Sequence, residues 1–254
     1  MARSYSLYVP AKAAVTRPVP LLIVLHGGGG NGAHFEQVSG FDQVADGAGI
    51  IVAYPNAVRA PAGQVAAWNS GDCCGFAART KIDDVGFIKG LIGALSSRYK
   101  IDPRRTYVAG YSNGGMLAYR IACQLAGTVA AIGVQSATLE FTPCRPSQPV
   151  SLVHIHGTAD THIPMVGGHG SGPSNADFAP PEQSAATIAT ADGCAATPAV
   201  SADPALAHAQ LHSWSGCLTG IAVQFVSVTG ATHAWMSTSA AQIWSFLAAH
   251  PRPA

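Results

Sequence analysis

Charged side chains are scarce in this sequence. Only 11% of the 254 residues are Asp, Glu, Lys or Arg, the formal net charge is +1, and Lys and Arg are scattered rather than clustered. A nucleic acid or an anionic membrane surface is bound by a concentrated basic patch, so we expect neither as a partner. What is abundant is hydrophobic residues, at 48%, which indicates a well-buried core.

Long apolar runs are also missing. No run is long enough to span a bilayer, and no charged-then-apolar leader opens the chain. Residues 1–9 already alternate in the manner of a strand. We therefore expect no membrane segment, and we expect that a signal peptide, if the natural protein has one, is absent from this sequence.

Cysteine is sparse but even in number. The six cysteines show no spacing typical of a metal site, which favours disulfides and hence an oxidising compartment; they are Cys73, Cys74, Cys123, Cys144, Cys194 and Cys217. We expect a Cys194–Cys217 pair, because each lies near a glycine in the same stretch. The pairing of the other four stays open, and buried free thiols in a cytosolic enzyme are the alternative. We predict a secreted or periplasmic protein.

Buried strands alternate with helices along the chain. We expect strands at 20–26, 49–54, 106–111, 129–135, 150–156 and 221–228, and helices at 34–47, 83–99, 114–126 and 238–250. This order is typical of βαβ units and a mostly parallel sheet with helices on both faces. It permits the α/β-hydrolase fold, while periodicity alone leaves other doubly wound folds open. We expect one catalytic domain over 1–254, with 157–220 as a loop-rich insertion and no large lid.

A glycine-flanked serine lies between a buried strand and a helix. Ser112 is the centre of Gly-Tyr-Ser-Asn-Gly at 110–114. A nucleophilic serine on a strained strand-to-helix turn needs glycines two residues either side, because larger side chains would collide there. A purely structural glycine-rich turn is the alternative. The strand before the motif and the helix after it favour Ser112 as a nucleophile.

An acid and a histidine follow later strands in the order that such a serine requires. Asp160 stands just beyond the strand at 150–156, and His233 follows the strand at 221–228. Active-site groups gather at the carboxyl ends of parallel strands. His233 would take the proton from the serine, and Asp160 would orient the imidazole. Asp177 and Asp192 are competitors for the acid, but neither directly follows a predicted strand.

Four other histidines are candidates for ligand or substrate contacts. His154 and His156 lie two apart on one strand face, but no Cys or acidic partner at ligand spacing accompanies them, so packing or support of the site is favoured over metal binding. His162 and His169 are candidate substrate-side residues. We expect no metal and no cofactor.

A run of four glycines follows the first buried strand. Gly28 lies in His-Gly-Gly-Gly-Gly at 26–30, where backbone N–H groups can approach a tetrahedral intermediate. We expect the amides of Gly28 and Asn113 to form an oxyanion hole. A phosphate-binding loop is the alternative, but no Gly-Lys-Ser/Thr follows.

With these residues in place, the chain resembles the polyhydroxybutyrate depolymerase and feruloyl esterase family of secreted bacterial esterases. The similar stretches are Tyr-Val-Pro at 8–10, Val-Leu-His-Gly at 24–27, Trp-Asn at 68–69, Cys-Cys-Gly at 73–75, Asp-Asp-Val at 83–85, Asp-Pro-Arg-Arg at 102–105, 110–115, 154–160 and His-Ala-Trp at 233–235. The resemblance implies a Ser112, His233 and Asp160 triad, secretion and disulfides. Gly28 stands where depolymerases of the family often carry Cys, and no polymer-adsorbing domain follows, so short or soluble esters are favoured.

The substrate side is less defined by the sequence. Trp235, Trp68 and Tyr111 are candidate contacts, and a tryptophan could form the wall for a feruloyl ring, although both could equally fill core. Arg79 and Lys81 are the few cations near the motifs, which does not select an anionic substrate. We predict a monomeric feruloyl (hydroxycinnamoyl) esterase acting on a small or oligomeric ester. Polyhydroxyalkanoate oligomers, other polyesters, acetylxylan and acyl transfer are the alternatives; the intact set of site residues argues against a non-catalytic binding protein.

Overall fold

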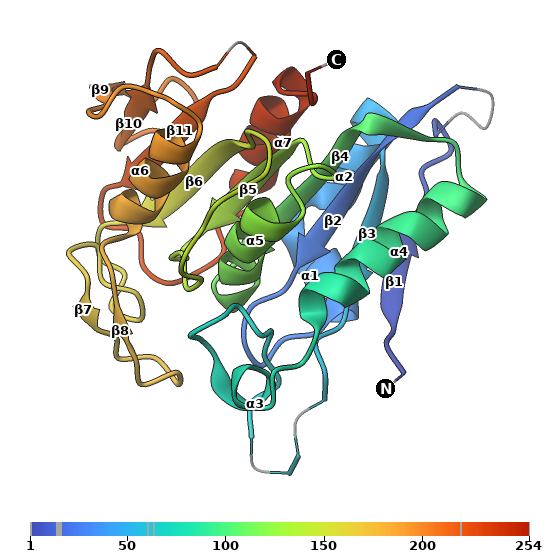
Figure 1. Ribbon diagram of the computed structural model, residues 1–254, viewed down its shortest axis with the longest axis horizontal. Helices are drawn as coiled ribbons and strands as arrows, with labels where there is room; N and C mark the ends of the chain where they lie inside the picture. The colour runs from blue at the N-terminus through green and yellow to red at the C-terminus, as the bar shows by residue number, and fades with distance from the viewer. Residues whose placement is uncertain (1, 14–16, 60, 63, 219, 254) are drawn as a thin grey trace.

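One nine-stranded sheet runs through the molecule, with helices on both faces (Figure 1). The computed structural model describes residues 2–13, 17–59, 61–62, 64–218 and 220–253. The strands of the sheet are β1 Tyr5–Tyr8, β2 Val19–Leu25, β3 Ile51–Pro55, β4 Ile101–Tyr111, β5 Ala131–Gln135, β6 Ser151–Gly157, β9 Ala199–Ala202, β10 Ala209–Trp214 and β11 Val223–Val228. A separate small hairpin pairs β7 Gly168–His169 with β8 Asp177–Phe178.

The order of the main sheet is β1-β3-β2-β4-β5-β6-β11-β10-β9. The pairings from β3 across to β11 are parallel, and the strands at both edges, β1 on one side and β10 with β9 on the other, pair antiparallel. The mostly parallel sheet expected from the sequence is therefore confirmed. The first residue of the predicted N-terminal strand, Met1, lies outside the described residues.

Helices cover both faces because the central strands are apolar on both sides. The helices are α1 Gly32–Ser39, α2 Phe41–Ala48, α3 Gly75–Arg79, α4 Asp84–Arg98, α5 Asn113–Gln124, α6 Pro181–Ala191 and α7 Ser239–Ala249. In β2, Leu21, Ile23 and Leu25 face the core beneath α4, α5 and α6, whereas Leu22 and Val24 face α1, α2 and α7. Alternation along one strand thus supplies both cores.

Three expectations about secondary structure were wrong in detail. The single helix expected at 34–47 is two helices, because Gly40 lies between them in the left-handed region at φ 83°. The segment 57–81, for which the sequence predicts neither helix nor strand, contains the short helix α3. The insertion at 157–220 is not mainly loop: it contributes α6, the β7–β8 hairpin and the edge strands β9 and β10. The expected single domain over 1–254 stays a prediction.

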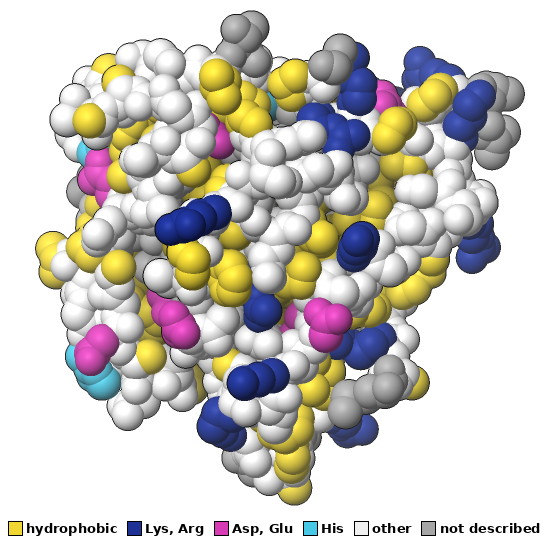
Figure 2. Space-filling model, in the orientation of Figure 1, with side chains coloured by type: hydrophobic (Ala, Val, Ile, Leu, Met, Phe, Trp, Pro, Cys, Tyr) yellow, Lys and Arg dark blue, Asp and Glu magenta, His cyan; other side chains and the backbone are white. Residues whose placement is uncertain are grey.

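The parallel strands end at one edge of the sheet, and the residues of the candidate site lie at this edge. Ser112 directly follows β4, Asp160 follows β6 by three residues, and His233 lies in the segment after β11. On the face shown in Figure 2, Lys and Arg side chains are dispersed among uncharged surface. None of the described helices combines the length and the apolar character needed to cross a membrane.

Candidate active site

Ser112 occupies a strained turn between β4 and α5. Its backbone has φ 53° and ψ −125°, a conformation that a residue with a side chain adopts at a cost. A Cβ added at Gly110 would collide with the Gly114 carbonyl, and one at Gly114 would collide with the carbonyls of Leu25 and His26. Both glycines of the motif are therefore required by the close approach of backbone to the turn.

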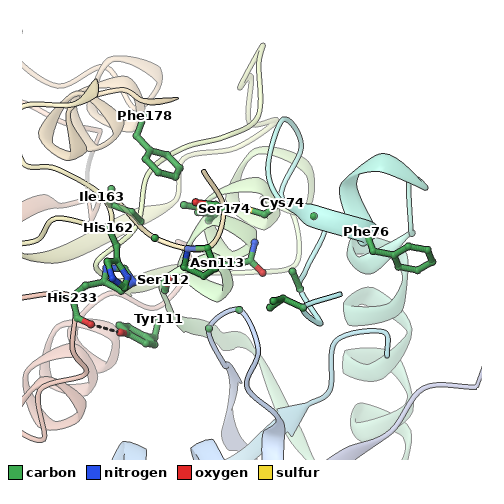
Figure 3. Close-up of a pocket in the computed structure, with 18 of the residues that line it drawn as sticks. Cys74, Phe76, Tyr111, Ser112, Asn113, His162, Ile163, Ser174, Phe178 and His233 are labelled. Atoms are coloured by element: carbon green, nitrogen blue, oxygen red, sulfur yellow. Dashed lines mark hydrogen bonds between the residues drawn. The ribbon is translucent and has the colours of Figure 1, made fainter. Parts of the chain in front are cut away.

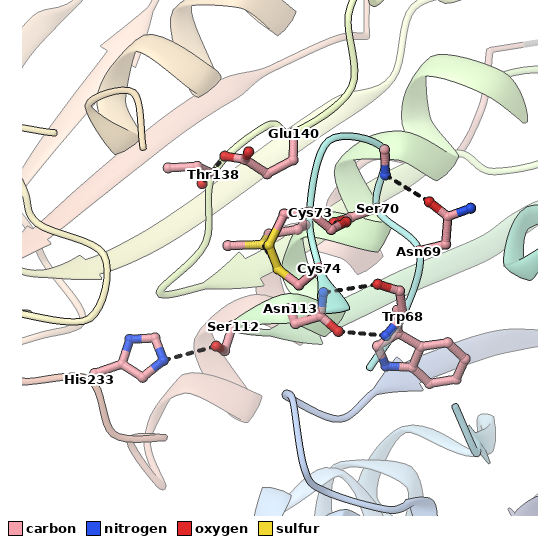
Figure 4. Close-up of a disulfide and its surroundings, with 12 residues drawn as sticks. Trp68, Asn69, Ser70, Cys73, Cys74, Ser112, Asn113, Thr138, Glu140 and His233 are labelled. Atoms are coloured by element: carbon pink, nitrogen blue, oxygen red, sulfur yellow. Dashed lines mark hydrogen bonds between the residues drawn. A yellow bond between two sulfur atoms is a disulfide. The ribbon is translucent and has the colours of Figure 1, made fainter. Parts of the chain in front are cut away.

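The serine is the first member of a continuous line of hydrogen bonds. Its Oγ lies 2.8 Å from Nε2 of His233, and Nδ1 of His233 lies 2.8 Å from Oδ2 of Asp160 (Figure 4 shows the Ser112–His233 bond). The competitors for the acid lie elsewhere. Asp177 pairs with His169 on the exposed β7–β8 hairpin, and Asp192 accepts from a backbone amide at the end of α6.

Asp160 is a buried carboxylate with a full set of donors. Its Oδ1 accepts from the backbone amides of His162 and Ile163, both at 2.9 Å. Burial alone would raise the pKa of Asp160, but the hydrogen bonds from His233 and the Ile163 amide outweigh burial and hold it below its usual value. Asp160 therefore carries a negative charge beside His233, where it can stabilise an imidazolium.

The glycine loop after β2 faces the start of α5. A Cβ at Gly28 would meet the Cβ of Asn113 at 3.9 Å, so these two residues are neighbours beside Ser112. The amide of Gly29 donates to the carbonyl of Ala66, in the segment before α3, and the amide of Gly30 donates to the carbonyl of Gly27 within the loop. No acceptor within the described part of the chain takes the Gly28 amide. The geometry suits Gly28 and Asn113 as paired backbone donors.

The ring of His26 holds this glycine loop in place through hydrogen bonds at both ring nitrogens. Its Nδ1 lies 2.7 Å from the Gly27 carbonyl, and its Nε2 accepts from the Ala57 amide at 3.2 Å. Burial lowers the pKa of His26 to about 4, despite its hydrogen bond to the Gly27 carbonyl. The ring therefore stays neutral, with one donor and one acceptor nitrogen, as these two partners require.

Trp68 does not form a substrate wall, and this expectation is corrected. The residue is fully buried, and its indole N–H donates to the His26 carbonyl at 2.9 Å. Its backbone amide and carbonyl hold the Asn113 side chain through bonds of 2.6 and 3.1 Å (Figure 4). Trp68 is a core residue that locks the first residue of α5 to the loop before α3.

Trp235 is likewise outside the pocket. Its indole N–H donates to the Ser39 carbonyl at 3.0 Å, and its ring packs against Phe35 and Phe41. The sequence could not show this, because the partners come from α1 and α2. Tyr111, in contrast, lines the pocket, and its hydroxyl donates to the His233 carbonyl at 2.8 Å. Of Trp68, Trp235 and Tyr111, the structure places only Tyr111 at the pocket.

A pocket of about 560 Å³ opens above Ser112 (Figure 3). His233 and His162 lie at one end and α3 with Phe76 at the other, with Ser112 between them. The apolar lining includes Val65, Cys74, Phe76, Met116, Ile163 and Phe178. Arg79 is the one Lys, Arg, Asp or Glu that lines this pocket in the described structure. Phe178, Ile163 and Met116 carry no sequence signal, because the first two come from an insertion and Met116 lies in the first turn of α5, outside the serine motif.

All six cysteines are paired. The predicted Cys194–Cys217 disulfide is present, and Cys123 pairs with Cys144. The neighbours Cys73 and Cys74 are joined to each other, and the Sγ of Cys74 lies 3.8 Å from the Met116 sulfur at the pocket (Figure 4). This vicinal pair places soft, polarisable atoms on the pocket wall, which suits contact with an aromatic ring.

The four other histidines considered in the sequence lie in three different places. His154 and His156 are fully buried on β6, in agreement with a role in packing or support. His162 lines the pocket, with its ring centroid 4.6 Å from that of His233. His169 is exposed on the β7–β8 hairpin and does not line the pocket.

The sequence profile of a family described as "Esterase PHB depolymerase" matches residues 3–148, more than half of the chain. The chain belongs to this family. The chain is 34% identical over 157 residues to feruloyl esterase B of Piromyces equi. This alignment covers 60% of the chain and 28% of that protein. It is 27% identical over 246 residues to a bifunctional acetylxylan esterase/xylanase of Neocallimastix patriciarum, covering 96% of the chain and 33% of that protein.

The chain thus spans about a third of the length of these two relatives. A solved acetyl xylan esterase from Aspergillus awamori superimposes with a TM-score of 0.72 over 96% of this chain and 93% of that one, at 16% identity. This similarity shows a shared fold. Together with the mostly parallel sheet, it confirms the α/β-hydrolase architecture predicted for this chain.

Proposed function

We propose that this esterase hydrolyses carboxylic esters through an acyl-serine intermediate on Ser112. The observation that carries the proposal is the line of two 2.8 Å hydrogen bonds from Ser112 Oγ through His233 to Asp160, at the floor of a pocket. The strained backbone of Ser112 and the adjacent amides of Gly28 and Asn113 support it. A buried, ionised acid next to a histidine has no comparable use in a passive binding site.

The residues divide the reaction between them. His233 Nε2 takes the proton of Ser112 as Oγ attacks the ester carbonyl, and Asp160 stabilises the imidazolium that forms. The amides of Gly28 and Asn113 stabilise the oxyanion, which the positive end of α5 also favours. His233 then protonates the departing alcohol, and the same steps with water release the acid and restore Ser112.

We propose a hydroxycinnamoyl group as the favoured acyl group. A pocket of about 560 Å³ is large enough for an aromatic acyl group and much larger than an acetyl group needs. Phe178 and the sulfur atoms of Cys74 and Met116 offer the contacts that an aromatic ring prefers. The similarity to a feruloyl esterase supports this choice.

A second candidate is deacetylation of xylan. It is favoured by the similarity to a bifunctional acetylxylan esterase/xylanase, which extends over 96% of the chain. Polyhydroxyalkanoate oligomers fit the same chemistry, and an alcohol that outcompetes water would turn the reaction into acyl transfer. The paired cysteines support action in an oxidising compartment, secreted or periplasmic. We propose that the enzyme acts there on esters of plant cell-wall polysaccharides, as a monomer without a cofactor.

A substrate panel tests the proposal. Values of kcat/KM would be compared for methyl ferulate, acetylated xylan, hydroxybutyrate oligomers and a soluble aromatic polyester oligomer, with added alcohols to detect transfer. We expect methyl ferulate to be hydrolysed with the highest kcat/KM. A kcat/KM tenfold higher for acetylated xylan than for methyl ferulate would overturn the proposed choice of acyl group but not the proposed mechanism. Absence of hydrolysis of every ester would overturn the function.

A further inference from the structure

Three buried polar side chains form a row that ends at Asp160. The hydroxyl of Tyr119, on α5, lies 2.8 Å from Nδ1 of His154. Nε2 of His154 lies 3.2 Å from Nδ1 of His156, and Nε2 of His156 lies 2.9 Å from the Ile163 carbonyl. All three side chains are fully buried, and none of them lines the substrate pocket.

The direction of every hydrogen bond in this row is determined by its last acceptor. The Ile163 carbonyl can only accept, so Nε2 of His156 carries the hydrogen. Burial lowers the pKa of both histidines, which keeps them neutral, and a neutral imidazole has one donor and one acceptor nitrogen. Nδ1 of His156 therefore accepts from His154, and Nδ1 of His154 accepts from the Tyr119 hydroxyl. The Tyr119 hydroxyl therefore donates to Nδ1 of His154 and completes the row.

The row connects to Asp160 through two contacts. Nε2 of His156 is 3.5 Å from Oδ2 of Asp160, the same oxygen that accepts from His233. Ile163 accepts from His156 at its carbonyl and donates from its amide to Oδ1 of Asp160 at 2.9 Å. The turn that presents Asp160 is thus attached to β6 and α5 by polar bonds, in addition to its packing.

Simple packing does not require this arrangement. The neighbouring ring on β11, Phe225, contacts both histidines and is apolar, so apolar side chains would fill the same space. Buried polar groups cost free energy unless each is hydrogen-bonded, and here all members have partners. Among the described residues, the titratable groups that face the two histidines are Tyr119, Asp160 and His233.

We propose that Tyr119, His154 and His156 are positioning residues, which hold Asp160 in the orientation that supports His233. This inference rests on the proposed function of Ser112, His233 and Asp160. If Tyr119 loses its hydroxyl, Nδ1 of His154 becomes a buried acceptor without a donor, and the row that holds the Asp160 turn loses its polar connection to α5. Asp160 then stabilises the His233 imidazolium less well, so kcat falls and the acid limb of the pH profile moves to lower pH.

The test compares Tyr119→Phe with Tyr54→Phe. Tyr54 is an equally buried tyrosine whose hydroxyl bonds to Asp42, away from the triad. We expect Tyr119→Phe to lower kcat about tenfold, with KM within twofold and the acid limb of kcat/KM at lower pH. Tyr54→Phe should leave kcat and the position of the acid limb of kcat/KM unchanged. Equal kcat and an unmoved acid limb in Tyr119→Phe would overturn the proposal.

A second measurement does not depend on activity or on a variant. Nitrogen-15 NMR of histidines in the wild-type protein reports which ring nitrogen carries the hydrogen. We expect His154 and His156 both to be neutral with the hydrogen on Nε2. A hydrogen on Nδ1 of either ring, or a charged ring at pH 7, would overturn the proposed row even if the esterase activity is confirmed. Failure of the proposed function would give a different result, because Ser112→Ala would then hydrolyse esters at the wild-type rate.

Discussion

Nε2 of His233 lies 2.8 Å from Oγ of Ser112, although 121 residues separate them in the chain. The distance is short because β4 and β11 are parallel strands of one sheet, so the segments that follow them meet at the same edge. The hydroxyl of Tyr111 adds a direct tie, since it donates to the His233 carbonyl at 2.8 Å. The residue before the serine thus holds the histidine loop in register with the serine.

Gly114 should not tolerate a side chain. Its Cβ would collide with the backbone carbonyls of Leu25 and His26, which cannot move without shifting β2. We expect Gly114→Ala to lower the free energy of unfolding by about 3 kcal/mol or more, measured by urea denaturation. Gly90→Ala is the matched control: Gly90 is exposed on α4 with open space around it, so it should be neutral or stabilising by up to about 1 kcal/mol. Equal stability of the two variants would contradict this account of the turn.

The sequence indicated the triad better than it indicated the pocket. Ser112, Asp160 and His233 each follow a strongly apolar strand, and strand ends meet at one edge whatever the loops do. Gly40 was read as part of one helix because the apolar spacing continues through it. The sequence does not predict β9 and β10 because neither contains the continuous apolar run that marks a strand buried on both faces: β9 has four residues and is exposed at the sheet edge, and β10 mixes apolar and polar residues.

Aromatic residues show the limit of sequence reasoning most plainly. Trp68 and Trp235 were sensible candidates for a substrate wall because each lies close to a motif. Both instead pack against residues distant in sequence, Asn113 in one case and Phe35 in the other. Phe178, which does line the pocket, lies 66 positions from Ser112 in a segment without periodicity. Which aromatic faces the pocket depends on tertiary packing that local patterns do not encode.

Phe178 should select for an aromatic acyl group. We expect Phe178→Ala to lower kcat/KM for methyl ferulate about tenfold, because an aromatic contact and its buried area are lost. Hydrolysis of p-nitrophenyl acetate, whose acyl group is too small to reach far along the pocket, should change less than about threefold. Phe141→Ala is the control, since Phe141 packs under Arg120 and does not line the pocket. A parallel loss for both esters in Phe178→Ala would argue against this role.

Asp192 should make stability depend on pH. It is fully buried, and burial raises its pKa to about 7, although the Val150 amide bonds to it. Because the folded pKa lies above the unfolded value of about 3.9, Asp192 favours folding at low pH and this contribution is lost as pH rises from about 4 to about 7.

Asp192→Asn should remove this pH dependence. A shift of about three pKa units sets an upper limit of about 4 kcal/mol on the gain of the variant over wild type between pH 4 and pH 8. Urea denaturation at both pH values measures the difference. The exposed Asp177→Asn serves as the control and should follow the wild-type curve. If Asp192→Asn also follows the wild-type curve, Asp192 is ionised at neutral pH and the assignment fails.

We expect every cysteine to be in a disulfide, and we expect the disulfides to stabilise the folded protein. Thiol titration of unfolded, unreduced protein should find no free thiol, because all six cysteines are paired. The Cys123→Ser, Cys144→Ser double variant should lose about 3 kcal/mol of stability, as expected for a bridge between residues 21 positions apart. Six free thiols in protein purified without reductant would contradict both the pairing and the oxidising compartment.

The central claim is that Ser112 is the nucleophile, and one variant tests it most directly. Initial rates of p-nitrophenyl butyrate hydrolysis would be measured for wild type and Ser112→Ala, with circular dichroism and urea denaturation to show that the variant is folded. The account predicts a folded protein whose kcat falls at least about 10⁴-fold, because His233 and the oxyanion hole remain but no hydroxyl is left to attack. A folded Ser112→Ala protein that hydrolyses the ester at the wild-type rate would contradict it.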